Sequence, residues 1–158
     1  MRLPVRKGFS FGLTSGIITT LGLIVGLHAG TNSRIAVLGG ILVIAIADAL
    51  SDALGIHISE ESENKHTVKE IWESTAYTFF SKLVFSMTFM VPVLFLELYT
   101  AIIVSIIWGL SLIAVFSFYI ACKQKASPWK MMAEHLVIAA LVIIITHYVG
   151  DWAAMVFG

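Results

Sequence analysis

Five long apolar segments constrain this chain more than any other feature of its sequence. They cover residues 9–28, 35–58, 76–96, 99–121 and 131–148. Each is close to the ~20 residues that an α-helix needs to cross a hydrocarbon core ~30 Å thick. The connectors are short, apart from an acidic one over residues 57–74. We therefore expect an all-α integral membrane protein, a single membrane domain over residues 1–158 with five transmembrane helices.

Composition supports the same class. The chain has 158 residues, of which 58% are hydrophobic and 13% charged, and its mean hydropathy is +0.92. A soluble domain of this size would expose too much apolar surface. Acidic and basic residues balance at ten each, which gives no indication of nucleic-acid binding, and the lone Cys122 excludes a disulfide framework. We expect a multi-pass protein in the lipid bilayer of a prokaryotic cell membrane.

The positions of Lys and Arg predict the orientation of the helices. Eight of these residues fall before the first span or in the second and fourth connectors: Arg2, Arg6, Lys7, Lys65, Lys69, Lys123, Lys125 and Lys130. Only Arg34 falls on the other side, and Lys82 lies within a span. Because cytoplasmic loops carry an excess of positive charge, we expect a cytoplasmic N-terminus and a C-terminus outside.

Two carboxylates interrupt the second apolar segment. Asp48 and Asp52 are the only Asp, Glu, Lys or Arg residues between Ile35 and Ile58. They are one helical turn apart and face the same way. Acidic side chains in hydrocarbon are costly unless a cation compensates them, so they indicate an ion or proton pathway by default.

Helical periodicity extends this pair into a polar stripe. At ~100° per residue, one arc of the second span holds six residues: Asp48, Ser51, Asp52, Gly55, Ser59 and Glu63. One arc of the first span likewise holds Gly8, Gly12, Gly16, Gly22, Gly26 and Gly30, with Ser15 and Thr19. The glycine face predicts close helix packing or a dimer contact, and its hydroxyls can also line a polar path.

Other polar residues have competing interpretations. Lys82 lies at a depth similar to that of Asp52, so the two can form a buried ion pair with a purely structural role. Alternatively, Lys82 can extend to the interface. Glu60 and Glu63 either collect cations at the cytoplasmic mouth or belong to a solvated helical extension. The remaining polar residues of the last span are read as interfacial: Glu134, His135, His147 and Asp151.

Several motifs resemble those of one family. They are residues 16–21 leading into Gly26, residues 47–55 followed by Ser59-Glu60, Pro92, and the ending with Lys125, Trp129-Lys130 and residues 148–150. Together they resemble the vacuolar iron transporter family over nearly the whole chain. The resemblance implies a parallel homodimer of five-helix subunits with a cation path between the first two helices. It also implies export of cytosolic Fe²⁺ or Mn²⁺ in exchange for protons.

The chain departs from the family pattern at three places. Ser15 stands where the family commonly has an acidic residue, and Asp52 stands where it commonly has Met. The connector over residues 57–74 is also too short for the family's cytoplasmic metal-binding domain. A hard carboxylate has thus replaced a soft thioether, and oxygen ligands suit Mn²⁺, Mg²⁺ or Ca²⁺ as well as Fe²⁺.

These observations predict a divalent-metal transporter without a resident cofactor. The expected metal ligands are Asp48, Asp52, Ser51, Ser15 and Thr19 in the membrane, with Glu60 and Glu63 at the mouth. The alternative is an accessory membrane subunit whose intramembrane acids are paired with Lys82. We expect no enzyme, because the chain lacks the Asp-Gly-Arg constellation of phosphatidyl-alcohol transfer. It also lacks the paired aspartates on separate helices that intramembrane proteases use.

Overall fold

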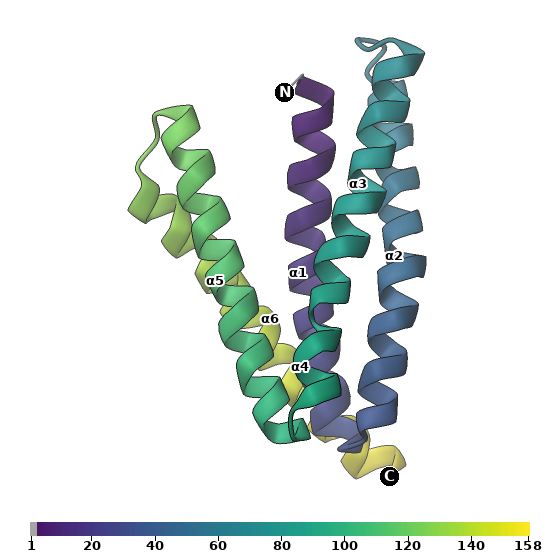
Figure 1. Cartoon of the computed structure of the whole chain (residues 1–158), viewed down its shortest axis with the longest axis vertical. Helices are drawn as coiled ribbons and strands as arrows, with labels where there is room; N and C mark the ends of the chain where they lie inside the picture. The colour runs from purple at the N-terminus through teal and green to yellow at the C-terminus, as the bar shows by residue number, and fades with distance from the viewer. Residues whose placement is uncertain (1–2) are drawn as a thin grey trace. The chain divides into compact units, whose positions relative to one another are not determined.

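The computed structural model describes residues 3–158, and within them it is almost entirely helical (Figure 1). The helices are α1 (Leu3–Thr31), α2 (Arg34–Ser62), α3 (Val68–Thr88), α4 (Met90–Phe95), α5 (Leu98–Gln124) and α6 (Pro128–Phe157). Within residues 3–158, five stretches are long and apolar enough to span a membrane, with α3 and α4 counting as one over Val68–Phe95. The predicted all-α class with five spans is confirmed, whereas the orientation and the dimer stay predictions.

The third span is broken near its end, a feature that the apolar pattern over residues 76–96 does not predict. α3 ends at Thr88, and Phe89 forms its C-cap before α4 begins. Pro92 explains the break, because it has no N–H to donate to the carbonyl of Thr88 and its ring clashes with that turn. A tight hairpin then leads into α5, whose N-cap is Glu97.

Helix fills most of the predicted acidic connector over residues 57–74. α2 continues to Ser62, Asn64 adopts a left-handed conformation with φ of 52°, and α3 begins after Thr67. The Thr67 hydroxyl accepts from the backbone N–H of Glu70, while the Glu70 carboxylate accepts from the backbone N–H of Thr67. This capping box stabilises the start of α3.

Replacing the cap tests its contribution. We expect Thr67→Ala to lower the free energy of unfolding by about 1 kcal/mol, the usual effect of losing an N-cap oxygen. Thr67→Ser keeps the oxygen and should remain close to the wild type. Equilibrium unfolding in mixed micelles measures both variants, and equal stability of the Ala and Ser variants would contradict the role of the cap.

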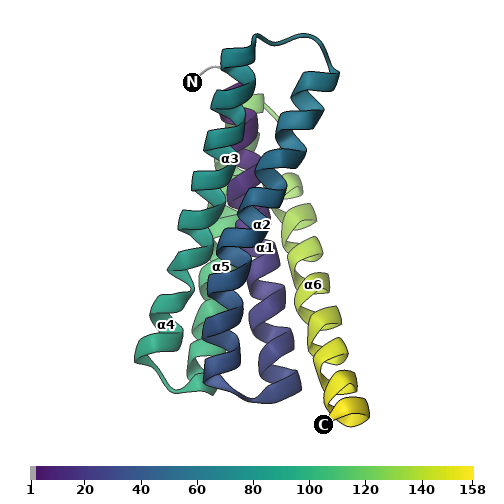
Figure 2. The same cartoon turned by 90° about the vertical axis from the view of Figure 1, so that its right-hand side faces the viewer.

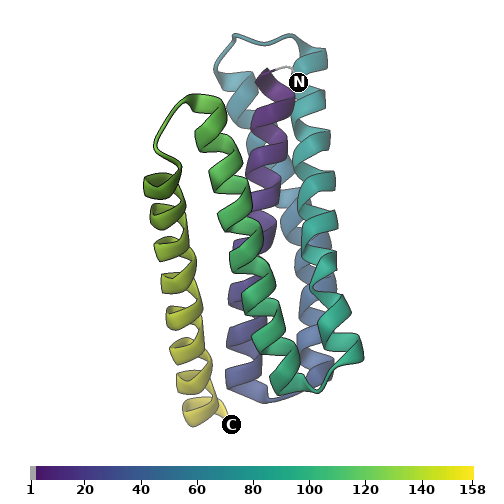
Figure 3. The same cartoon turned by 60° about the vertical axis from the view of Figure 1, so that its left-hand side comes forward.

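The chain divides into two compact units, and the division between them falls within α1 and within α2. The first unit runs to Thr20 and continues over Ile41–Met90, and the second contains Leu21–Gly40 and Val91–Gly158. Within the first unit, α3 lies beside the C-terminal half of α2 and the N-terminal half of α1 (Figure 2). Within the second unit, α5 and α6 form an antiparallel pair (Figure 3).

The glycine face of α1 packs closely against other helices in both units. In the first unit, a Cβ added at Gly8 or Gly12 would meet the backbone of α3, and one at Gly16 would lie 3.0 Å from the Lys82 carbonyl oxygen. In the second unit, a Cβ at Gly26 would lie 3.2 Å from the Thr146 carbonyl oxygen, and Gly22 and Gly30 also face α6. The glycines therefore make room for neighbouring helices within one chain, and their role in a dimer stays a prediction.

Candidate cation site

Lys82 joins the two carboxylates of the second span. Its Nζ lies 2.5 Å from Asp52 Oδ2 and 2.5 Å from Asp48 Oδ2. It also donates a hydrogen bond of 2.9 Å to Ser15 Oγ. We call Ser15, Asp48, Asp52 and Lys82 the inner cluster. It brings together α1, α2 and α3 within the first unit.

The two carboxylates are held differently. Asp52 Oδ2 accepts hydrogen bonds from the Lys82 ammonium and, at 2.6 Å, from the Ser15 hydroxyl. Asp48 Oδ2 is in ionic contact with Lys82 but lacks hydrogen-bond alignment and has no other partner in the described residues. Three oxygens thus surround an ammonium that has three N–H donors. Two carboxylates and one ammonium leave the inner cluster with a net charge of −1.

The inner cluster lies at the edge of the unit's core. The Lys82 side chain is fully buried, whereas those of Asp48 and Asp52 are 30% and 19% exposed. The buried face of α2 is formed instead by small and apolar residues such as Ala45, Ala49 and Ile56. The rest of the predicted stripe lies on the exposed surface of α2, and its members there are Ser51, Gly55 and Ser59.

A second group of charges, the outer cluster, lies at the end of the first unit that contains the α2–α3 loop. Glu60 is fully buried and lies 2.8 Å from Lys7 Nζ and 3.2 Å from His66 Nε2. Lys7 also donates to Glu63 at 3.3 Å. This hydrogen bond and the charge of Lys7 hold the pKa of Glu63 below its ordinary value, so Glu63 is ionised at neutral pH.

The structure separates the predicted metal residues into distinct groups. Ser15, Asp48 and Asp52 come together. Glu60 lies eight residues beyond Asp52 along α2, a separation of about 12 Å at the usual helical rise. The Thr19 hydroxyl donates to the Ser15 carbonyl oxygen within α1, at 2.9 Å. Among residues 3–158, no group of three or more His, Cys, Asp or Glu side chains is arranged to hold a metal ion. The oxygen groups of the inner cluster are two carboxylates and the Ser15 hydroxyl.

Two contacts of the outer cluster have no counterpart in the sequence predictions. Lys82, by contrast, contacts both carboxylates, the pairing that the accessory-subunit alternative expects. Lys7 and His66 were read only as part of the charge bias and the connector, yet both contact Glu60. Helical periodicity relates residues of one helix, so it gives no signal for these pairs: Lys7 lies on α1, Glu60 on α2, and His66 in the loop after α2.

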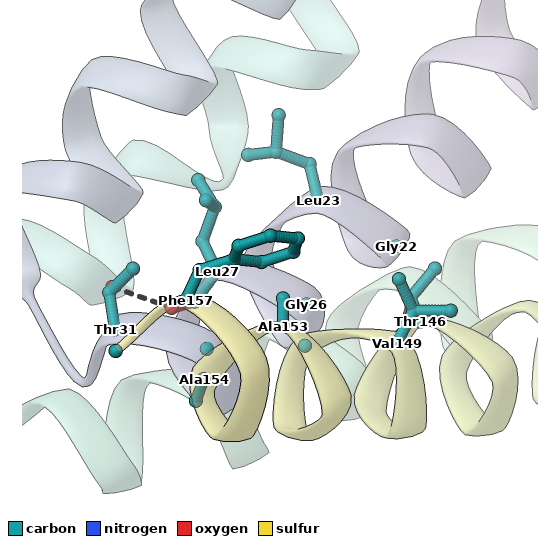
Figure 4. Close-up of a pocket in the computed structure, with 13 residues that line it drawn as sticks. Gly22, Leu23, Gly26, Leu27, Thr31, Thr146, Val149, Ala153, Ala154 and Phe157 are labelled. Carbon is teal, nitrogen blue, oxygen red and sulfur yellow. Dashed lines mark hydrogen bonds between the residues drawn. The ribbon is translucent and has the colours of Figure 1, made fainter.

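The second unit holds polar contacts of another kind. His135 Nδ1 lies 2.7 Å from Ser117 Oγ and joins α5 to α6, and His147 pairs with Asp151 at 3.4 Å within α6. A hollow of about 700 Å³ lies along the glycine face of α1 and the end of α6 (Figure 4). Residues such as Gly26, Ala153 and Phe157 line it, and no titratable side chain does.

The first unit thus holds two carboxylates and an ammonium within helices apolar enough to span a membrane. The model of the VIT family, the family of vacuolar iron transporters, matches residues 7–72. The predicted resemblance to this family of metal-ion transporters is therefore confirmed over α1, α2 and the start of α3. Ser15, Asp48 and Asp52 lie within the match, and Lys82 lies beyond it. Neither the curated proteins nor the solved structures that were compared include a match to the chain.

Proposed function

We propose that this protein exports divalent transition-metal cations, Fe²⁺ or Mn²⁺, from the cytosol. The observation that carries the proposal is the pair of partly exposed carboxylates, Asp48 and Asp52, one turn apart within an apolar span. Carboxylate and hydroxyl oxygens are suitable ligands for Mn²⁺ and other hard divalent cations. The family match over the same helices supports metal as the transported ion.

Proton exchange follows from the chemistry of these ligands. A carboxylate must lose its proton before it binds a metal, so protons and metal compete for the same oxygens. Ser15 supports the pair by donating to Asp52, and Ser51 lies on the same face of α2. Glu63, which stays ionised, attracts cations toward the cytoplasmic end. Proton binding to Asp48 and Asp52 on the outer side then releases the metal.

A parallel homodimer would complete the site. Ser51, Gly55 and Ser59 are exposed on α2 within one chain, and a polar stripe of this kind is not stable against lipid. No atom lies within 4 Å of a Cβ added at Gly55, so a second helix has room to approach. We infer that the same face of a second copy covers this stripe and encloses the cation path.

Transport in a purified system tests the proposed function. The protein is reconstituted into liposomes that contain a divalent-metal dye, and Mn²⁺ or ascorbate-reduced Fe²⁺ is added outside. We expect metal entry well above that of protein-free liposomes. Protons should leave the liposomes in exchange, so a pH dye inside them should report a rise in internal pH. An absence of metal flux at every pH gradient tested would contradict the proposal.

The full pairing of Lys82 favours a second candidate, an accessory membrane subunit. In that case the inner cluster only joins three helices. Lys82→Met should then disrupt folding, because it leaves the partly buried carboxylates of Asp48 and Asp52 without a counter-ion. A transporter should still assemble with this substitution and show altered transport. Size-exclusion chromatography and thermal unfolding of the Lys82→Met variant, followed by the flux assay, separate the two candidates.

A further inference from the structure

We propose that the Lys82 ammonium is a built-in cation that occupies the metal position and makes the site selective for divalent over monovalent ions. The inference rests on the proposed function and assigns a role to a residue outside the segment matched by the family. The Lys82 Nζ atom lies between the two carboxylates that are the proposed metal ligands.

The geometry places the ammonium where a transported cation would be bound. Nζ is within 3 Å of one oxygen each from Asp48, Asp52 and Ser15. These are the same oxygens that a metal ion requires, and the fully buried Lys82 side chain reaches them from α3. A cation and the ammonium cannot share this space, so the ammonium has to move aside, still charged, before the metal is bound.

The charge of the incoming ion decides whether that exchange is favourable. A monovalent cation that replaces the ammonium brings the same charge to the two carboxylates, and it gains no additional attraction in return for breaking the Lys82 contacts. A divalent cation brings twice the charge, and the attraction to each carboxylate doubles. Lys82 therefore blocks Na⁺ and K⁺ from the inner cluster while it permits Fe²⁺ or Mn²⁺ to enter.

The test compares Mn²⁺ binding and Na⁺ competition in the full-length protein. The variants are Lys82→Met, which removes the charge at similar length, and Lys130→Met as a matched control on α6, outside the inner cluster. Free Mn²⁺ is measured by electron paramagnetic resonance of the purified protein, with and without a large excess of NaCl, and choline chloride provides the same ionic strength. In the wild type and in Lys130→Met, we expect NaCl and choline chloride to have the same effect.

In Lys82→Met, we expect Mn²⁺ to bind at least tenfold more tightly and Na⁺ to compete with it beyond the effect of choline. Wild-type affinity with no specific Na⁺ competition in this variant would overturn the proposal, and so would specific Na⁺ competition in the wild type. If Lys82→Met does not fold, Lys82→Gln provides the same neutralisation with a polar side chain and carries the same expectations.

Failure of the proposed function gives a different pattern. If the wild type binds no Mn²⁺ but Lys82→Met does, the ammonium occupies a cation site without admitting a divalent ion, so both the selectivity inference and metal transport by the wild type are contradicted. If neither protein binds Mn²⁺, both the inference and the proposed function are overturned. Mn²⁺ binding to the wild type that is unchanged in Lys82→Met overturns the inference alone.

Discussion

Metal flux should fall at least tenfold when either carboxylate of the inner cluster is neutralised, in Asp48→Asn or in Asp52→Asn. Each substitution keeps the shape of the side chain and removes one of the two charges that attract the cation. A tenfold loss corresponds to only about 1.4 kcal/mol of binding free energy, which is modest for a charged ligand in an apolar span. Initial rates of Mn²⁺ entry into liposomes measure the effect.

The matched control for this prediction is Asp151→Asn. Asp151 is also an aspartate on a spanning helix, but it lies near the end of α6, is 44% exposed and pairs with His147. Its flux should remain within about twofold of the wild type. Wild-type rates in both Asp48→Asn and Asp52→Asn would remove the inner cluster from the transport path, and an equal loss in Asp151→Asn would indicate a nonspecific effect.

The second large effect is expected at Gly12, where α1 and α3 are in contact. A Cβ at this position would collide with the Thr78 carbonyl oxygen and the Ser81 hydroxyl, and it would lie 3.0 Å from Thr78 Cα. Because backbone atoms cannot move aside cheaply, Gly12→Ala should lower the free energy of unfolding by about 1–3 kcal/mol. Displacement of α3 also moves Lys82, so metal flux should fall with stability.

Gly39→Ala makes the same chemical change where nothing lies within 4 Å of the added Cβ. It should leave stability unchanged or raise it by up to about 1 kcal/mol, since alanine favours helix over glycine. Thermal unfolding in detergent compares the two variants directly. If Gly12→Ala is as stable as Gly39→Ala, the result would contradict the close contact between α1 and α3 at Gly12.

The spans themselves were predictable because hydropathy over ~20 residues is a strong signal. The ends of the helices are less predictable from hydropathy: the last span is predicted over residues 131–148, and α6 runs from Pro128 to Phe157. Backbone hydrogen bonding carries a helix beyond the hydrocarbon core, where hydropathy no longer reports it. The break at Phe89 also escaped prediction, although Pro92 was noted, because a proline within a span can either bend or end a helix.

The inner cluster was only partly predictable. The i, i+4 spacing placed Asp48 and Asp52 on one face of α2, and depth alone brought Lys82 near Asp52. That the ammonium reaches both carboxylates depends on the rotation of α3 about its axis, which the close approach of α3 to Gly12 and Gly16 determines. Sequence periodicity gives the face of each helix, but the packing of small residues decides which faces meet.

Binding of Mn²⁺ to the purified protein tests most directly whether Asp48 and Asp52 form the cation site. Electron paramagnetic resonance measures free Mn²⁺ during titration of the wild type, the Asp48→Asn/Asp52→Asn double variant and Asp151→Asn. We predict that the wild type and Asp151→Asn bind Mn²⁺ with similar affinity and that the double variant loses this binding. Undiminished binding in the folded double variant would contradict the assignment of the cation site to the inner cluster.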